Sequence, residues 1–167
     1  MTDLIRAATD MDHSALRQEL ASTGRIVTNL MKRGKHASTV TPLRRAFLRL
    51  CEEVEANLQQ EETVLFPALI AAEEALSAGR PMPVNAFGSV RNPISMMEQA
   101  HTRIRAILDE MRSMTENYTM SDPSCEMLGL FSRALHALDD GLREHLDHED
   151  KEIFPRAKRL EVSPRTV

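Results

Sequence analysis

Residues 57–67 read NLQQEETVLFP, and residues 145–155, which lie 88 positions later, read HLDHEDKEIFP. Each stretch contains a nitrogen-bearing side chain, an acid four residues later, and then an apolar residue followed by Phe and Pro. His101 lies 44 residues from the start of each stretch, and His13 lies 44 residues before the first. This even spacing predicts four similar helices that each bring one such side chain to a common level, as in a metal site in the core of a helical bundle.

Proline and glycine divide the chain into four predicted helical segments. The segments cover about residues 3–32, 41–76, 92–117 and 122–160. The last three begin with a capping side chain followed by proline, as Thr41-Pro42, Asn92-Pro93 and Asp122-Pro123. The loop between the second and third segments contains two prolines and two glycines, which do not continue a helix.

Within each segment, seam residues recur at alternating steps of three and four, which directs one seam toward neighbouring helices. The predicted seam positions are His13, Leu16, Leu20, Thr23, Val27 and Leu30; Leu43, Phe47, Leu50, Val54, Asn57, Glu61, Val64 and Ala68; Ile94, Met97, His101, Ile104, Leu108 and Met111; and Leu128, Phe131, Leu135, Leu138, Leu142, His145 and Glu149. The pattern predicts an all-α fold, an up-down-up-down four-helix bundle. We expect one domain over residues 1–160 and a frayed C-terminal tail over residues 161–167.

Composition and charge exclude several classes of protein. The net charge of −4 disfavours nucleic-acid binding, which needs a dense face of Lys and Arg. No apolar run approaches the ~20 residues of a membrane span, and residues 1–12 lack the apolar centre of a signal peptide. Cys51 and Cys125 are too few for a disulfide framework. These features predict a cytoplasmic protein with free thiols.

Six polar residues occupy seam positions where Leu or Val would pack better: His13, Asn57, Glu61, His101, His145 and Glu149. Burying unpaired carboxylates and amides is unfavourable, and two carboxylates in one core also repel each other. A cation removes both penalties, and imidazole with carboxylate but no thiolate favours iron, with manganese or zinc as alternatives. The other histidines, His36, His136 and His148, are expected in a loop or on solvated helix faces.

With these residues, the chain resembles a hemerythrin-like domain of the HHE cation-binding family, and within it the di-iron proteins that repair iron centres. The resemblance covers nearly the whole chain, and the paired Phe-Pro blocks are its most specific feature. It rests on His13-x-x-x-Arg17-x-x-Leu20, the acid-acid-x-x-Leu-Phe-Pro block of residues 61–67, Pro93-Ile94-Ser95-x-Met97 before His101, and His145-x-x-x-Glu149-x-x-x-x-Phe154-Pro155-Arg156-Ala157.

The resemblance implies three terminal iron ligands and two glutamates that bridge a pair of irons, together with an oxo or hydroxo bridge. These residues are His13, His101 and His145, and Glu61 and Glu149, respectively. The second helix has Asn57 where such relatives carry a fourth histidine. An amide oxygen is a poorer iron donor than imidazole, so we expect one metal position to be weakened. Either Glu53, one turn earlier, or water is expected to fill the place.

The resemblance implies a cytoplasmic non-haem iron protein that acts in the response to nitrosative or oxidative stress, for example by supplying iron to damaged iron–sulfur client proteins. A second hypothesis is a sensor or carrier that binds O₂ or NO. A third is a degenerate bundle with a partial metal site that acts as a structural or regulatory binder. The sequence leaves open whether the protein is an enzyme.

Overall fold

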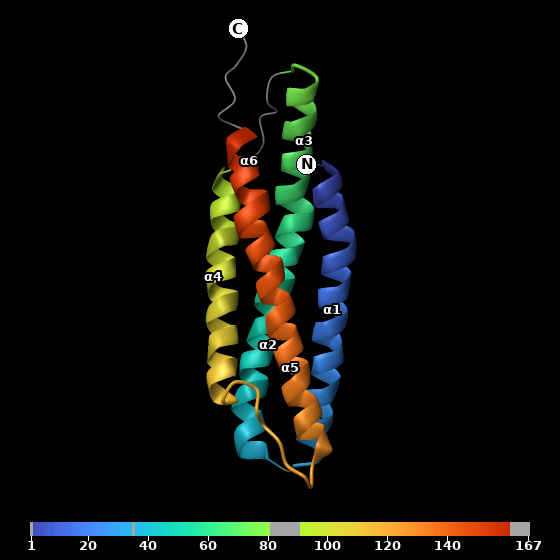
Figure 1. Cartoon of the computed structure of the whole chain (residues 1–167), viewed down its shortest axis with the longest axis vertical. Helices are drawn as coiled ribbons and strands as arrows, with labels where there is room; N and C mark the ends of the chain where they lie inside the picture. Colours follow the sequence, from blue (N-terminus) through green and yellow to red (C-terminus); the bar gives the residue numbers. More distant parts are fainter. Residues whose placement is uncertain (1, 35, 81–90, 161–167) are drawn as a thin grey trace.

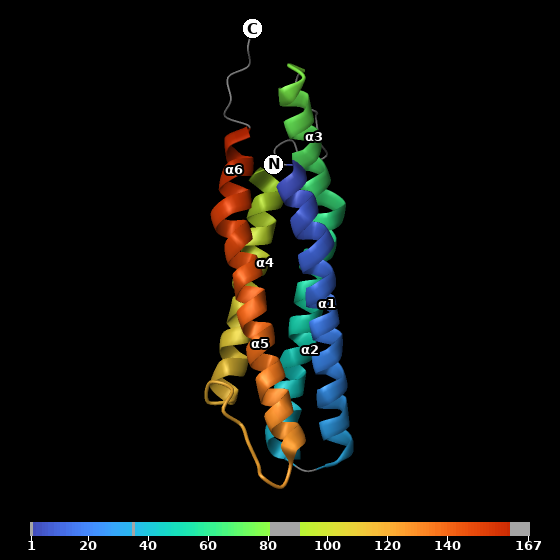
Figure 2. The same cartoon turned by 45° about the vertical axis from the view of Figure 1, so that its right-hand side comes forward.

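The computed structural model is a bundle of four long helical rods (Figure 1). The structure describes residues 2–34, 36–80 and 91–160. The first rod is α1 (Thr2–Lys32) and the third is α4 (Arg91–Met114). The rods alternate in direction, and α1 packs against α2 and α5 while α4 packs against α2 (Figure 2). The predicted all-α, up-down-up-down four-helix bundle is confirmed.

The second and fourth rods each contain a π-helical turn within an otherwise α-helical run. The second rod consists of α2 (Ala37–Gln60), η1 (Glu61–Leu65) and α3 (Phe66–Ser77). The fourth consists of α5 (Glu126–His148), η2 (Glu149–Ile153) and α6 (Phe154–Leu160). Both π turns therefore begin at the acid of the repeated stretch.

The Phe-Pro pair explains why each π turn occurs where it does. The backbone N–H of Phe66 bonds to the carbonyl of Glu61, five residues back, and that of Phe154 bonds to the carbonyl of Glu149. A proline follows each of these phenylalanines. In a regular α-helix the proline ring clashes with the carbonyl four residues earlier, and the wider π turn relieves that clash.

Because a π turn adds one residue, the buried seam moves by one position above it. Val64 and Ala68, which the regular spacing predicts in the seam, are only half-buried. Leu65 and Leu69 take their places and are both 0% exposed. The prediction is wrong for Val64 and Ala68 because a count in steps of three and four omits the extra residue. All other predicted seam residues are buried.

The second rod begins earlier than the sequence predicts. Helix α2 starts at Ala37 rather than Thr41, and Pro42 lies inside it. The carbonyl of His36 accepts the backbone N–H groups of Thr39 and Val40 at 3.0 and 2.9 Å. This extra turn is retained because it buries Val40 completely.

The third rod ends earlier than predicted, at Met114 rather than near residue 117. Glu116, Asn117 and Tyr118 have φ angles of 49°, 63° and 61°, which are left-handed and terminate the helix. The fourth rod starts at Glu126 because Asp122 caps a separate turn, in which its Oδ1 accepts the backbone N–H of Ser124 at 2.8 Å.

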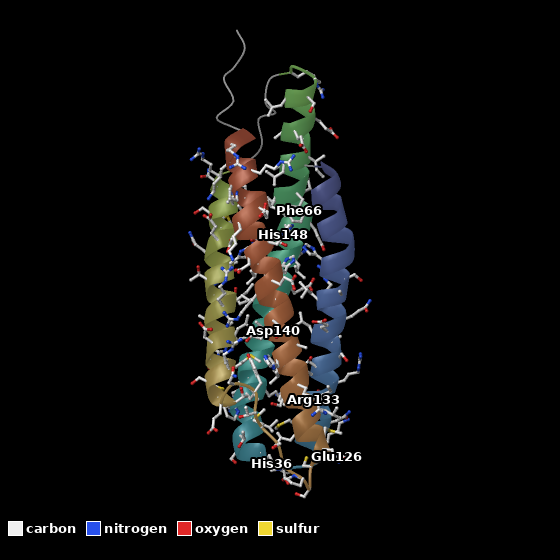
Figure 3. All side chains as sticks on the ribbon, viewed as in Figure 1. His36, Phe66, Glu126, Arg133, Asp140 and His148 are labelled. Carbon is white, nitrogen blue, oxygen red and sulfur yellow. The ribbon has the colours of Figure 1, made fainter. Side chains whose placement is uncertain are left out.

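Two apolar clusters fill the interior, and a polar level separates them. The upper cluster consists of Leu65, Phe66, Leu69, Ile94, Met97, Ile153, Phe154 and Ala157. The lower cluster is larger and extends to the opposite end of the bundle. Figure 3 places Phe66 and His148 at nearly the same height, close to the polar level.

The remaining predictions from the sequence concern membrane spans, the two cysteines, the long loop and the C-terminal tail. None of the helices in the described ranges is long and apolar enough to cross a membrane. Cys51 and Cys125 are free thiols, as predicted. Residues 81–90 of the predicted loop and the predicted tail, residues 161–167, lie outside the described residues.

A buried carboxylate, that of Asp139 on α5, stabilises the lower part of the bundle. It forms ion pairs with Arg112 at 2.6 Å and Arg143 at 2.7 Å, and it accepts a hydrogen bond from the Tyr118 hydroxyl at 3.0 Å.

We expect Asp139→Ala to lower the free energy of unfolding by about 3 kcal/mol, because three buried or half-buried donors lose their acceptor. Urea denaturation tests this. The control Asp140→Ala, at a residue that is 65% exposed, should change it by less than about 0.5 kcal/mol.

Candidate metal centre

A buried polar cluster occupies the level of the two π turns and draws on all four rods. Its members are His13 of α1, Asn57 of α2, Glu61 of η1, His101 of α4, His145 of α5 and Glu149 of η2. None of the six is more than 7% exposed. In His13, Glu61, His145 and Glu149, one ligand atom from each residue lies within 4.8 Å of the others.

Histidine nitrogens surround the two glutamates. His13 Nε2 lies 3.1 Å from Glu61 Oε2, and His101 Nε2 lies 3.2 Å from Glu149 Oε2. His145 Nε2 lies between the two acids, 3.9 Å from Glu61 Oε2 and 3.7 Å from Glu149 Oε2. Since His101 Nε2 is also 3.7 Å from Glu61 Oε1, Glu61 faces imidazoles from three rods.

Seven inward-facing atoms of this cluster lack hydrogen bonds. Among the described residues, the buried side-chain atoms without a hydrogen-bond partner are His13 Nε2, Asn57 Oδ1, Glu61 Oε2, His101 Nε2, His145 Nε2 and both carboxylate oxygens of Glu149. The short contacts between these groups therefore lack the geometry of hydrogen bonds. Each unpaired buried group costs about 1–3 kcal/mol. A single centre where imidazole and carboxylate lone pairs converge fits a cation, which satisfies all of them together.

Carboxylates that follow the two glutamates in sequence hold the outer nitrogens of two histidines. His13 Nδ1 lies 2.9 Å from Glu62 Oε1, and His101 Nδ1 lies 2.9 Å from Asp150 Oδ1. Because an ionised carboxylate only accepts, each Nδ1 carries the proton that it donates. The Nε2 atom of each ring is then the one that faces inward and can bind a cation once it carries no proton.

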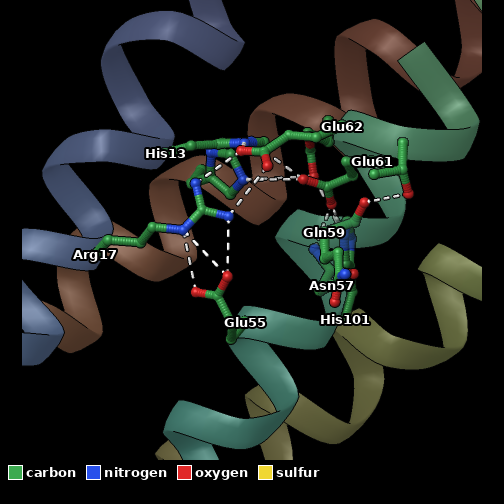
Figure 4. Close-up of polar contacts among 11 residues, drawn as sticks. His13, Arg17, Glu55, Asn57, Gln59, Glu61, Glu62 and His101 are labelled. Atoms are coloured by element: carbon green, nitrogen blue, oxygen red, sulfur yellow. Dashed lines mark hydrogen bonds and ion pairs between the residues drawn. The ribbon is translucent and has the colours of Figure 1, made fainter. Parts of the chain in front are cut away.

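Arginines one turn after these histidines hold the same carboxylates. Arg17 Nη1 lies 2.7 Å from Glu62 Oε1, and Arg105 Nη1 lies 2.8 Å from Asp150 Oδ2. Figure 4 shows Arg17 between Glu62 and Glu55, which it also binds at 3.0 Å. Each supporting carboxylate is thereby fixed between an imidazole and a guanidinium.

The phenylalanines of the repeated blocks cover the same two imidazole rings. Phe66 stacks on His13 with ring centroids 6.0 Å apart, and Phe154 stacks on His101 at 5.4 Å. The 88-residue repeat of the sequence is therefore also a repeat in space. Each half supplies a central glutamate, a supporting acid, a histidine, an arginine and a covering ring.

The repeat breaks at one position, where Asn57 corresponds to His145. The Asn57 amide donates from Nδ2 to Glu61 Oε1, while its Oδ1 is buried without a partner. His145 lies close to His13, with ring centroids 5.2 Å apart. The side of the cluster near His13 thus has two imidazoles, and the side near His101 has one imidazole and an amide.

Six of the seven residues predicted for the site come together here, and Glu53 does not. The Glu53 side chain is 32% exposed and pairs with Arg103 on α4 at 3.0 Å. Glu53 directly precedes Val54, which is in the seam, so it lies about 100° away from the seam around the helix. Its expected role as a replacement ligand is corrected accordingly.

The supporting residues Glu62, Asp150 and Arg105 were not predicted from the sequence. A signal for them existed, because Glu62 and Asp150 are 88 residues apart, as are Arg17 and Arg105. Outside the cluster, as predicted, are His36, which pairs with Asp122 at 2.7 Å, the 51% exposed His136, and His148.

Burial and neighbouring charges shift the pKa values of the cluster. For His101, burial opposes protonation, but the carboxylates of Asp150, Glu149 and Glu61 raise its pKa to about 11. Burial, with the charge of Glu61, raises the pKa of Glu149 to about 7. Burial would raise the pKa of Glu61, yet the surrounding imidazoles hold it well below its usual range. Without a cation, the cluster therefore retains protons that a cation must displace.

The fold and this cluster together define a helical-bundle protein with a buried imidazole and carboxylate site for a cation. A sequence model described as the hemerythrin HHE cation binding domain matches residues 4–157. The chain belongs to this hemerythrin family.

Curated relatives carry the name iron-sulfur cluster repair protein YtfE. The protein from Edwardsiella ictaluri is 30% identical over 108 residues, which are 65% of this chain and 43% of that protein. Those from Salmonella paratyphi B and Salmonella newport are 27% identical over 108 residues, with the same coverage. The chain thus spans less than half the length of these relatives.

A substitution at Glu62 tests whether a residue that only orients a histidine ligand affects metal affinity. We expect Glu62→Gln to weaken metal binding by about 10- to 100-fold, because the His13 ring loses the charged acceptor that fixes its orientation. Glu55→Gln is the matched control, since Glu55 also binds Arg17 but does not contact His13. Competition with a chelator measures both affinities. Equal affinities in the two variants would contradict a role for Glu62.

Proposed function

We propose that the buried polar cluster binds iron and that the protein acts in the cytoplasm as a non-haem iron protein, supplying iron for the repair of iron–sulfur clusters under nitrosative or oxidative stress. The observation that carries the proposal is the convergence of buried, unpartnered nitrogen and oxygen atoms from all four rods. Membership of a cation-binding family supports it, and so does the name of the relatives, iron-sulfur cluster repair protein.

We infer two unequal metal positions in the cluster. Glu61 and Glu149 would be shared between them. His13 and His145 would complete the first, and His101 with the Asn57 amide would complete the second. Imidazole with carboxylate, in the absence of thiolate, suits iron. Bound iron would supply redox chemistry and open coordination places for a small ligand.

The protein side chains have separate roles in this proposal. Glu62 and Asp150 hold the Nδ1 protons of His13 and His101, which keeps their Nε2 atoms directed inward. Phe66 and Phe154 cover the outer faces of the same rings and exclude water. The Nε2 atoms are thus positioned before any metal arrives, which lowers the cost of ordering them on binding, and His101 releases its Nε2 proton when the metal binds.

Two measurements test the proposal. Protein reconstituted anaerobically with ferrous iron and then desalted should retain iron, and exposure to air, which oxidises the iron, should then produce a near-ultraviolet absorption band; His145→Ala should retain less iron. Incubation with a cluster-depleted iron–sulfur protein should then transfer iron to it. Wild-type protein that retains no iron, or a His145→Ala variant that behaves like wild type, would refute iron binding at this site.

A second candidate function is reversible binding of O₂ or NO, as in a sensor or carrier. The amide at position 57 favours it, because a weak donor leaves a coordination place for an external ligand. Anaerobic spectra recorded before and after gas addition distinguish the two functions. Reversible spectral shifts without iron loss support the carrier or sensor, and net iron transfer supports repair.

We expect metal binding at pH 7 to release protons and to weaken as the pH falls. With a pKa of about 11 His101 is protonated at pH 7, and with a pKa of about 7 Glu149 is partly protonated. A cation needs both groups deprotonated, so each released proton lowers the apparent affinity by about tenfold per pH unit of acidification. Calorimetry in buffers of different ionisation enthalpy counts these protons. Binding without proton release at pH 7 would contradict the pKa assignments.

A further inference from the structure

A surface groove between α1 and α5 reaches the buried polar cluster. The groove has a volume of about 650 Å³, and its lining includes Glu19, Gly141, Glu144, His145, His148 and Glu152. His145 is the residue that the groove and the cluster share. The groove therefore ends at a residue of the proposed metal centre.

Acidic side chains surround this groove. Glu19, Glu144 and Glu152 are exposed, and the described part of the chain provides no ion-pair partner for any of them. Lys151 also lines the groove, but Asp147 holds its ammonium at 2.6 Å. The carboxylates thus leave the groove with a local negative charge, which attracts cations.

His145 joins the groove to the buried polar cluster. Its side chain is more than nine-tenths buried and lines the groove, while its Nε2 faces Glu61 and Glu149 inside the cluster and has no hydrogen-bond partner. His13 and His101 are 1% and 0% exposed and have their Nδ1 atoms held by Glu62 and Asp150. His145, at 7% exposed, is the most accessible imidazole of the cluster.

A glycine keeps the groove open one turn before His145. A Cβ atom at Gly141 would lie 3.6 Å from Glu19 Oε2, so a larger side chain there would enter the space between α1 and α5. Glycine in the middle of a helix is unfavourable by roughly 0.5–1 kcal/mol relative to alanine. The missing side chain at this position therefore preserves the groove at a cost in helix stability.

We propose that this groove is the route by which a hydrated divalent cation enters and leaves the metal centre. Glu19, Glu144 and Glu152 attract the cation, and His145 takes it from the groove into the buried polar cluster. The inference rests on the proposed metal-binding function. In it, the groove acids increase the rate at which the cation enters and leaves, and they do not change the equilibrium affinity of the metal centre.

Stopped-flow uptake of ferrous iron under anaerobic conditions tests the route. The triple variant Glu19→Gln, Glu144→Gln, Glu152→Gln should load about tenfold more slowly at low ionic strength, and the difference should shrink at high salt. The iron retained per chain at equilibrium should remain that of wild type. The matched control is Glu52→Gln, Glu74→Gln, Glu126→Gln, which removes the same charge from exposed acids outside the groove and should load at the wild-type rate.

A second variant tests the route by size instead of charge. Gly141→Leu should also slow uptake and leave the equilibrium iron content unchanged, because it fills the groove without changing a ligand. Wild-type rates in both groove variants would overturn the route while leaving iron binding intact. Reduced equilibrium iron in the triple variant would overturn it as well, since the acids would then be ligands. Wild-type protein that takes up no iron would instead refute the proposed function.

Discussion

Glu61→Gln is expected to abolish metal binding, whereas Glu53→Gln, the same change two turns earlier in the second rod, should leave it intact. Glu61 faces His13 at 3.1 Å, His101 at 3.7 Å and His145 at 3.9 Å, and it is the carboxylate shared by both proposed metal positions. Removing one partner of a buried charged group costs about 3–5 kcal/mol, which is about two to three and a half orders of magnitude in affinity. Desalted protein should then hold almost no iron.

The control variant makes this result specific. Glu53 forms its ion pair with Arg103 at the surface, so its neutralisation changes the net charge equally but does not reach the cluster. Circular dichroism in the presence of a chelator should show that both metal-free variants are folded. Full iron content in a folded Glu61→Gln protein would mean that Glu61 is not a shared ligand.

Asn57→His is expected to restore the missing imidazole and to equalise the two metal positions. Asn57 is the residue where the spatial repeat fails, since the corresponding residue is His145. The wild-type protein should therefore bind one metal more tightly than the other. The variant should strengthen the weaker position by at least about tenfold and raise the retained metal toward two per chain. Metal analysis after dialysis against a graded chelator measures both steps.

The reverse substitution is the matched partner of this experiment. His145→Asn places an amide in both halves of the cluster, and it should therefore remove the tighter metal position. Asn57 is 2% exposed, so the larger imidazole also adds volume to a packed core and should lower the stability of the metal-free protein by about 1–3 kcal/mol. If the wild-type protein binds two metals with equal affinity, the two proposed positions are not unequal. That result would also contradict the hypothesis of a degenerate bundle with a partial metal site.

The sequence was sufficient to predict the bundle because its seam is regular below the metal level. Leu128, Phe131 and Leu135 on α5, for example, follow steps of three and four and are all buried. The same rule fails at Val64, because a π turn is a departure from the repeat on which the rule depends. The prolines at 67 and 155, inside predicted helices, were the available sign of that departure.

The proposed ligands were predictable from the sequence and the residues that support them were not, for a physical reason. Glu61 and His145 stand out because a polar residue in an apolar seam is conspicuous within its own helix. The contact of Glu62 with His13 joins two rods, so it depends on how the rods are rotated about their axes. The pattern of residues along one helix gives no information about that rotation. Glu53 was assigned to the site because it lies one turn from Asn57, although that turn places it off the seam.

The surplus residue in each π turn has a consequence for changes in chain length. Deleting a single residue between 62 and 65 would place Leu65 three residues and Leu69 seven residues after Glu61, which are the steps of a regular helix, so both leucines would still face the interior. Pro67 would then lose the wide turn that relieves its clash with the carbonyl four residues earlier. Deleting a residue from the regular helix between Asn57 and Glu61, by contrast, would rotate Glu61, Leu65 and Leu69 by about 100° relative to Asn57 and should disrupt the cluster.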